Sequence, residues 1–247
     1  MEGVTRRTAL AMGSAPVVAG VATYATRGLW ERDPRPRFAP AEPARAAIQQ
    51  RHLPNVSLVT HDGMRVRFYD DLVRGKSVVL TFVSSAAPAE SSKVTRNLAA
   101  IQRLFGNRVG RDMFLYSIAR NPERDSQAAL GRWAIWSGAG PGWKFLTGRN
   151  ADVERLRHGL GFGSDDPGED ANPAFSVGVV RYGTEPEMRW GHCQSQAEPQ
   201  VIAHSLLLDF GLGRADPRSP VARTFGTGAS PGGAPVWNCK LLLDSVA

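Results

Sequence analysis

The chain has 247 residues, a length that suits one medium-sized domain with additional terminal segments. Hydrophobic residues make up 42% of the chain, which is enough for a packed core and argues against global disorder. The formal net charge is +7, but the basic residues are scattered among acidic ones, without a basic block interleaved with aromatics. This pattern indicates a mixed, solvated surface and argues against a nucleic-acid-binding protein.

The first residues, 1–28, predict an export signal or a membrane anchor. Arg6 and Arg7 precede an uncharged run from Ala9 to Ala25, the order of a positive and then an apolar signal region. The arginine pair resembles a twin-arginine signal. The run is shorter than the about 20 residues that a membrane-spanning helix needs, so a cleaved signal and an uncleaved anchor both remain open. Residues 29–53, rich in Pro, Arg and Ala, predict a partly extended linker that contains His52.

A hairpin, a buried strand and a helix are predicted next along the chain. Residues 56–70 alternate apolar and polar around His61-Asp62-Gly63, and Asp-Gly between such runs is a hairpin signal that leaves His61 in a solvated turn. Residues 76–83 form a continuous apolar run, typical of a central strand buried on both faces. Apolar residues at helical spacing then predict a helix capped by Ser91 or Ser92 and ended by Gly106 and Asn107; they are Val94, Leu98, Ile101 and Leu104.

The second half of the domain alternates strands and helices in the same way. The predicted strands are residues 112–120, residues 143–148 and two strands within residues 176–193. The predicted helices are residues 125–137, with Ala129, Trp133 and Trp136 on one face, a helix capped by Asn150 that leaves His158 on the surface, and residues 199–211.

This order predicts an α/β protein with a thioredoxin-like fold and an N-terminal hairpin. Strands alternating with helices indicate a βαβ crossover and a parallel core, and a closing hairpin and helix follow. We expect this domain to span residues 54–212. Residues 213–247 shift to Gly, Pro and Ser, which predicts a loosely ordered tail.

The stretch TFVSSAAPAESSKVTRNL, residues 81–98, places a small-residue turn between the first central strand and its helix. Many folds hold a reactive site at such a turn, yet this one offers only alanines, serines, one proline and Glu90. The turn is therefore built like a site that lacks reactive side chains.

Several long phrases in this domain resemble the SCO/SenC family. They are DGMRVRFYDDLVRGKSVVLTFV, RNLAAIQRLFGNRVGRDMFLYSIARNPERD and GPGWKFLTGRNADVERLRHGLGF, and the resemblance covers roughly residues 54–208. It implies a thioredoxin-like, membrane-anchored or exported protein that handles copper for the assembly of cytochrome oxidase. The signal-like N-terminus agrees with this implication.

The resemblance also implies a copper site, whose ligands are missing here. Family members carry a CxxxC motif after the first central strand and a distant histidine just before a later strand, because soft thiolates favour Cu(I) and imidazole binds either oxidation state. These positions align with Ala87, Ser91 and Ser176. A methyl group and two neutral hydroxyls bind copper poorly, and no dithiol can form, so we expect neither a metal nor family-type thiol exchange at this turn.

Other residues of the chain offer alternatives to the missing copper ligands. His192 and Cys193 are adjacent in a predicted strand, where neighbouring side chains point to opposite faces, so both would reach one copper ion only at a bulge. Cys193 and Cys239 would act as a redox pair only if the fold brings them together. An acidic loop (Asp165, Asp166, Glu169 and Asp170) offers oxygens for a hard metal, but a solvated loop is the simpler interpretation. A hydrolase is disfavoured because no G-x-S-x-G elbow or triad is found.

The sequence thus favours an exported, periplasmic binding or assembly module, tethered by its N-terminal segment or released from it. Its expected partners are respiratory oxidase or copper-handling assembly proteins, and it needs no cofactor and performs no enzymatic reaction. The alternatives are a copper chaperone with His192 and Cys193 as relocated ligands, and a thiol oxidoreductase that uses Cys193 and Cys239.

Overall fold

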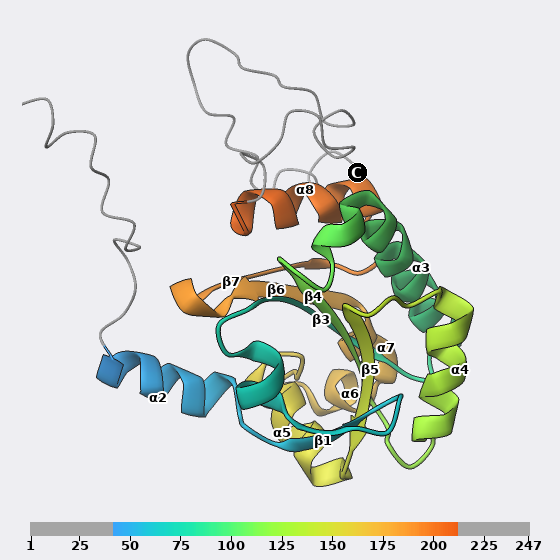
Figure 1. Cartoon of the computed structure of the whole chain (residues 1–247). Helices are drawn as coiled ribbons and strands as arrows, with labels where there is room; N and C mark the ends of the chain where they lie inside the picture. The colour runs from blue at the N-terminus through green and yellow to red at the C-terminus, as the bar shows by residue number, and fades with distance from the viewer. Residues whose placement is uncertain (1–41, 212–247) are drawn as a thin grey trace, which may run out of the picture. The chain divides into compact units, whose positions relative to one another are not determined.

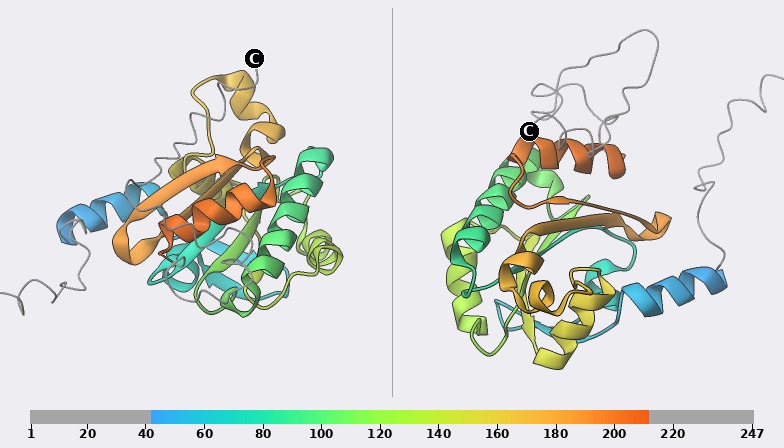
Figure 2. Two further views of the ribbon diagram at one scale, coloured as in Figure 1. Left: turned by 90° about the horizontal axis from the view of Figure 1, so that it is seen from above. Right: turned by 180° about the vertical axis from the view of Figure 1, so that it is seen from behind.

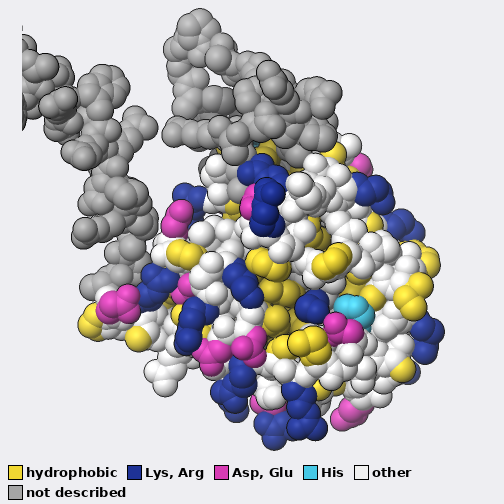
Figure 3. Space-filling model, viewed as in Figure 1, with side chains coloured by type: hydrophobic (Ala, Val, Ile, Leu, Met, Phe, Trp, Pro, Cys, Tyr) yellow, Lys and Arg dark blue, Asp and Glu magenta, His cyan; other side chains and the backbone are white. Residues whose placement is uncertain are grey.

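The computed structural model of this chain describes residues 42–211 (Figure 1). The predicted signal or anchor, the twin-arginine pair, the first part of the linker, the C-terminal tail and Cys239 lie outside the described residues. Within residues 42–211, no helix combines the length and the apolar character needed to cross a bilayer. Figure 3 shows basic and acidic side chains interspersed over one face of the domain, in keeping with the mixed surface that the sequence predicts.

A seven-stranded mixed sheet forms the centre of the domain, in the order β2-β1-β5-β4-β3-β6-β7. The strands are β1 (Ser57–Thr60), β2 (Arg65–Arg67), β3 (Ser77–Val83), β4 (Phe114–Ala119), β5 (Trp143–Gly148), β6 (Val179–Thr184) and β7 (Arg189–Gln194). The central strands β3, β4 and β5 run parallel, and every other pairing is antiparallel. The predicted parallel core is confirmed.

Helices lie on both sides of this sheet (Figures 1 and 2). They are α2 (Glu42–His52), η1 (Phe68–Val73), α3 (Pro88–Phe105), η2 (Gly106–Arg108), α4 (Gln127–Ser137), α5 (Asn150–Gly159), α6 (Pro167–Ala171), α7 (Pro173–Val177), η3 (Glu185–Glu187) and α8 (Pro199–Asp209). Helix α3 packs against α8 and α4, and α5 packs against β5. Helix α7 packs against both β3 and α3, which places it next to the β3–α3 turn.

The topology is thioredoxin-like, as the sequence predicts. The crossover β3–α3–β4 is followed by the β6–β7 hairpin and α8, and the four strands lie in the order β4-β3-β6-β7. Strand β5 and the β1–β2 hairpin extend this core beyond β4. Strand β3 lies in the middle, and all its residues from Val78 to Val83 are buried, which explains its uninterrupted apolar sequence.

The predicted N-terminal hairpin is confirmed, with Gly63 at a φ of 89° in its turn. His61 is not simply solvated, however. Its Nδ1 accepts a hydrogen bond from the backbone N–H of Phe145 at 3.2 Å, and its ring meets the Phe145 ring edge-on. The cause of this contact is tertiary. Strand β1 pairs with β5, so the turn that follows β1 lies next to Phe145 of β5.

Two predicted helix caps are wrong by a few residues. Helix α3 begins at Pro88, with Ala87 as its N-cap, because proline has the φ of a first helical position and no N–H to leave unbonded. Helix α5 already includes Asn150, and Arg149 is the N-cap. The predicted end of α3 is confirmed at Gly106, which has a φ of 55°.

Residues 42–52, which we assigned to the linker, form the helix α2 and include His52. Alanine, glutamine and arginine are good helix formers, and Pro43 lies in the first turn. A tertiary contact holds this helix: Arg45 Nη2 donates to the Glu185 carboxylate at 2.8 Å. The sequence contains no local sign of this contact, which joins residues 140 positions apart.

Glu185 is a buried acceptor that joins three parts of the domain. Its carboxylate accepts from Arg45, from the hydroxyl of Tyr69 at 2.9 Å and from the backbone N–H of Gly75 at 2.8 Å. Burial alone would raise the pKa of Glu185, but these three donors outweigh burial and hold the pKa below its ordinary value of 4.5. A carboxyl group with a lowered folded-state pKa stabilises the fold above its ordinary pKa, and this contribution is lost as the pH falls.

We therefore expect Glu185→Gln to reduce the free energy of unfolding at pH 7 by about 2 kcal/mol, because the charge-assisted hydrogen bonds are lost. The difference from the wild-type chain should shrink between about pH 5 and pH 3, as the wild-type carboxylate becomes protonated. Urea unfolding at several pH values measures both. Glu187→Gln is the control, since this more exposed residue lies 3.4 Å from Arg189 and should change stability by less than about 0.5 kcal/mol. An equal difference at pH 7 and pH 3 would contradict this role of Glu185.

Candidate functional site: the turn between β3 and α3

The turn from Ser84 to Ala87 lies at the carboxyl end of β3, next to the end of the parallel strand β4. Parallel α/β sheets bind ligands at this edge because loops and helix N-termini converge there. Ala87, the first of the three aligned ligand positions, is 4% exposed and ends the turn as the N-cap of α3. Its methyl group is buried in the core cluster and offers no donor atom.

Ser91, the second position, lies one turn into α3 and is fully buried. Its Oγ accepts a hydrogen bond from the Ser84 backbone N–H at 2.8 Å and donates to the Ser84 carbonyl at 2.9 Å. The hydroxyl thus closes the turn against the helix. Both of its principal hydrogen-bonding functions are used inside the protein, which makes it unsuitable as a ligand for an external group.

Ser176, the third position, is also fully buried and lies in the short helix α7, which ends at Val177 just before β6 begins at Val179. Its Oγ donates to the Phe162 carbonyl at 3.1 Å. The Phe162 ring in turn meets the Phe82 ring of β3 edge-on, with centroids 4.8 Å apart. Because α7 packs against β3 and α3, the third position lies in an element that contacts those carrying the other two.

Asp125 is a polar group at this turn that the sequence analysis missed. It is 4% exposed, and its Oδ1 accepts from the Ser85 backbone N–H at 3.1 Å. Its Oδ2 is buried without a hydrogen-bond partner among residues 42–211. An acidic residue shortly after a buried strand was the available signal, but only the fold brings it to the Ser84–Ala87 turn.

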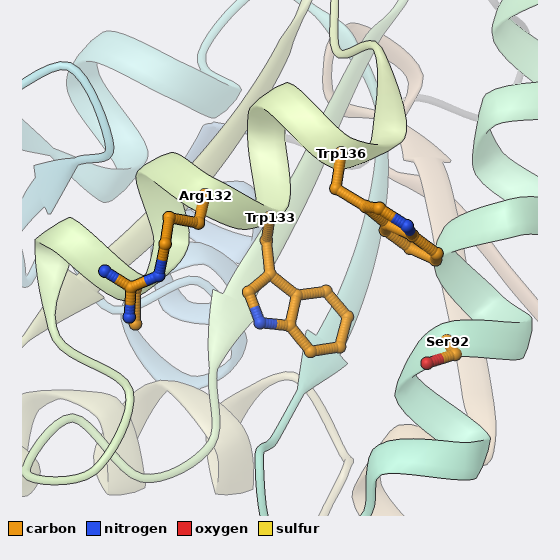
Figure 4. Close-up of a pocket in the computed structure, with 5 residues that line it drawn as sticks. Ser92, Arg132, Trp133 and Trp136 are labelled. Carbon is orange, nitrogen blue, oxygen red and sulfur yellow. The ribbon is translucent and has the colours of Figure 1, made fainter.

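A surface groove lies between α3 and α4, lined by Ser92 of α3 and by Ala129, Arg132, Trp133 and Trp136 of α4 (Figure 4). We call it the tryptophan groove; its volume is about 310 Å³. The ring centroids of Trp133 and Trp136 are 6.0 Å apart, and Trp136 is 57% exposed. The sequence correctly places Ala129, Trp133 and Trp136 on one face, but the core face of α4 is formed by Leu130 and Ala134.

The replacement ligand pair lies on opposite faces of β7. His192 is exposed, whereas Cys193 is 6% exposed, and β6 and β7 pair in continuous register through both residues. A regular strand without a bulge cannot direct two successive side chains to one ion. Among residues 42–211, no three His, Cys, Asp or Glu side chains are arranged to hold a metal.

The acidic loop has structural roles within the domain. Asp166 caps α6 by accepting from the N–H groups of Gly168 and Glu169. Asp170 pairs with the buried guanidinium of Arg157, with Oδ2 2.6 Å from Nη2. This hydrogen bond is the main reason that the pKa of Asp170 lies well below its usual range. Two of the four loop carboxylates, those of Asp166 and Asp170, are thus engaged in a helix cap and in an ion pair.

No protein-family model and no curated protein matches this chain. Several solved structures are similar to it. Copper-bound ScoI from Arabidopsis thaliana is 19% identical, with a TM-score of 0.49 over 63% of this chain and 96% of that one. Copper-bound yeast Sco1 is 16% identical, with a TM-score of 0.49 over 65% of this chain and 92% of that one. A SCO1/SenC family lipoprotein from Bacillus anthracis is 14% identical, with a TM-score of 0.49 over 61% and 90% of the two chains.

The contacts of Ser91 predict a specific effect on stability. In Ser91→Ala the buried N–H of Ser84 loses its acceptor, which should lower the free energy of unfolding by about 1–3 kcal/mol. Ser92→Ala is a matched control on the next residue, because Ser92 is half-buried in the groove, and we expect a change within about 0.5 kcal/mol. Chemical denaturation measures both, and equal effects of the two substitutions would show that Ser91 does not hold the turn.

Proposed function

We propose that this chain is an exported, divergent SCO/SenC-like protein that acts as a binding or assembly module, with respiratory oxidase or copper-handling assembly proteins as partners. One observation carries the proposal. At the positions where the family resemblance implies two thiolates and an imidazole, the chain has a buried methyl group and two hydroxyls that are bonded to its own backbone.

The chemistry of these groups supports a role without copper at this turn. Cu(I) prefers thiolate and imidazole, whereas a serine hydroxyl stays protonated at neutral pH and is a weak ligand. Thiol–disulfide exchange needs a thiolate that attacks a disulfide sulfur, and the turn contains no sulfur. The proposed role is therefore not enzymatic and needs no cofactor.

The tryptophan groove supports a role in partner contact. Tryptophan and arginine are enriched in the well-packed centres of protein interfaces, because they bury a large area and still offer polar contacts. Trp133, Trp136 and Arg132 meet this description and share the groove with Ser92 of α3. A turn that no longer holds a metal can still retain the shape of a docking surface, since fold and chemistry are separable.

The N-terminal sequence supports export. The arginine pair and the uncharged run after it have the order of a twin-arginine signal, and retention of this segment would tether the domain to the membrane. The alternative chaperone with His192 and Cys193 is disfavoured by their opposite orientations on β7. The alternative redox pair depends on Cys239, which lies outside residues 42–211.

A copper titration tests the absence of the metal site. Titrated with Cu(I) under reducing conditions and with Cu(II), the full chain should show no stoichiometric tight binding. The triple variant Ala87→Cys, Ser91→Cys, Ser176→His should gain it, because α7 places the third position beside the turn. Cys193→Ser in both backgrounds is the control. Tight binding by the wild-type chain that Cys193→Ser abolishes would support relocated ligands and contradict the proposal.

A complementation experiment tests the docking role. In the source organism, loss of this chain should lower cytochrome oxidase activity in membranes, and the wild-type chain should restore it. The variant Trp133→Ala, Trp136→Ala should fail to restore it at equal protein level, because the proposed contact surface is removed. Ile135→Ala is the matched control, since Ile135 is 83% exposed on the same helix but does not line the groove. Full restoration by the tryptophan variant would exclude the groove as the contact.

A further inference from the structure

A second pocket, of about 360 Å³, lies away from the β3–α3 turn, between α2, α5 and the β6–β7 hairpin. Figure 1 shows these elements converging at one end of the domain, where α2 contacts α5 and Arg45 ties α2 to η3. The side chains that line the pocket are Ile48, His52, Leu53, His158, Leu160, Arg181 and Trp190. They combine an apolar wall with several basic groups, the composition of a site for an amphipathic anion.

Arg181 is the charged group of this pocket, and its charge is uncompensated. Its Nη2 donates to the Gly161 carbonyl at 2.5 Å, and its guanidinium lies 5.7 Å from the centroid of the Phe162 ring. Its Nε is buried without a hydrogen-bond partner, and no carboxylate among residues 42–211 pairs with it. Burial without a counter-ion lowers the pKa of Arg181.

Other partly buried arginines of the domain each form an ion pair with a carboxylate. Arg120 pairs with Glu154, Arg157 pairs with Asp170, and Arg45 pairs with Glu185. A desolvated charge without a partner is unfavourable, so buried charges are normally paired. Arg181 departs from this pattern where it faces a cavity, which points to a negative group supplied from outside the chain.

Neighbouring groups favour an anion as well. His192 lies directly opposite Arg181 in the β6–β7 register, so its side chain is on the same face of the sheet. The carboxylates nearest to His158 are those of Glu154 and Asp170, and both are already bound to Arg157. No unpaired carboxylate among the lining residues repels a negative ligand.

The remaining lining residues indicate the size and apolar character of the uncharged part of a ligand. Ile48, Leu53, Leu160 and the Trp190 indole provide an apolar wall, and the volume lies near the lower end of the about 300–1,000 Å³ range of small-molecule sites. The absence of a side chain at Gly161 lets the Arg181 guanidinium lie close to the Gly161 backbone. The φ of Gly161 is 71°, and a Cβ there would lie 2.6 Å from Arg181 Nη2. A single unpaired positive charge matches a single negative charge on a compact body.

We propose that this pocket binds a monocarboxylate with a compact aromatic or alkyl body, with the carboxylate on the Arg181 guanidinium and the body against Trp190, Ile48 and Leu53. The proposal does not depend on the assembly role, because the pocket shares no lining residue with the tryptophan groove.

The probe is 5-fluoroindole-3-acetate, followed by ¹⁹F NMR on the full chain. It should bind at least tenfold more tightly than 5-fluoroindole-3-acetamide, which has the same ring without the charge. Inorganic phosphate at the same concentration should not displace it, because a bare anion does not use the apolar wall. Equal binding of acid and amide, displacement by phosphate, or no binding of the acid at millimolar concentration would each overturn the proposal.

Arg181→Met should weaken binding of the acid at least tenfold and leave binding of the amide unchanged. Arg189→Met is the matched control on the same hairpin, since Arg189 is 49% exposed and faces Glu187; its affinity should stay within twofold of wild type. Arg181→Lys, which keeps the charge but not the planar fork, should bind the acid better than Arg181→Met. Unchanged affinity in Arg181→Met would overturn the proposal, and should that variant fail to fold, the acid and amide comparison on the wild-type chain decides.

Discussion

The hydroxyl of Ser91 joins the β3–α3 turn to its helix by bonding both the N–H and the carbonyl of Ser84. A thiolate at this position would have to remain open toward a metal. The hydroxyl instead joins the end of the central strand to the first turn of α3, and both groups it bonds are buried. These two internal hydrogen bonds stabilise the strand–turn–helix geometry, because they satisfy buried backbone groups at the end of the strand.

Phe162 contacts both Ser176 and Arg181. Its carbonyl accepts from Ser176, its ring packs edge-on against Phe82 of β3, and the Arg181 guanidinium lies 5.7 Å from its ring centroid. The neighbouring Gly161 carbonyl accepts a hydrogen bond from Arg181. The segment that contains Gly161 and Phe162 is thus bonded by Ser176 of α7 and by Arg181 of β6.

Local patterns were sufficient to predict the strands of the sheet and the helices α3, α4, α5 and α8, in their order along the chain. The continuous apolar run of β3 and the Asp-Gly turn of the β1–β2 hairpin each reflect one dominant physical requirement, burial on both faces or a positive φ. The contacts that sequence alone could not reveal are tertiary. The sequence from Glu42 to His52 favours a helix, but Arg45 holds it only through Glu185, and Asp125 reaches the turn only because β3 and β4 are adjacent.

The same distinction applies to Ala87, Ser91 and Ser176. The elements that carry them, the N-terminus of α3 and the helix α7, pack against each other and against β3 in the core. What the side chains do there depends on their partners, and a serine that bonds a backbone carbonyl looks the same in sequence as one that faces solvent. The contrast between Glu185, whose three donors compensate its charge, and Arg181, whose charge has no partner among residues 42–211, is likewise visible only in three dimensions. A paired buried charge stabilises the fold, whereas the half-buried, unpaired charge of Arg181 lines a pocket and is the basis of the ligand proposal above.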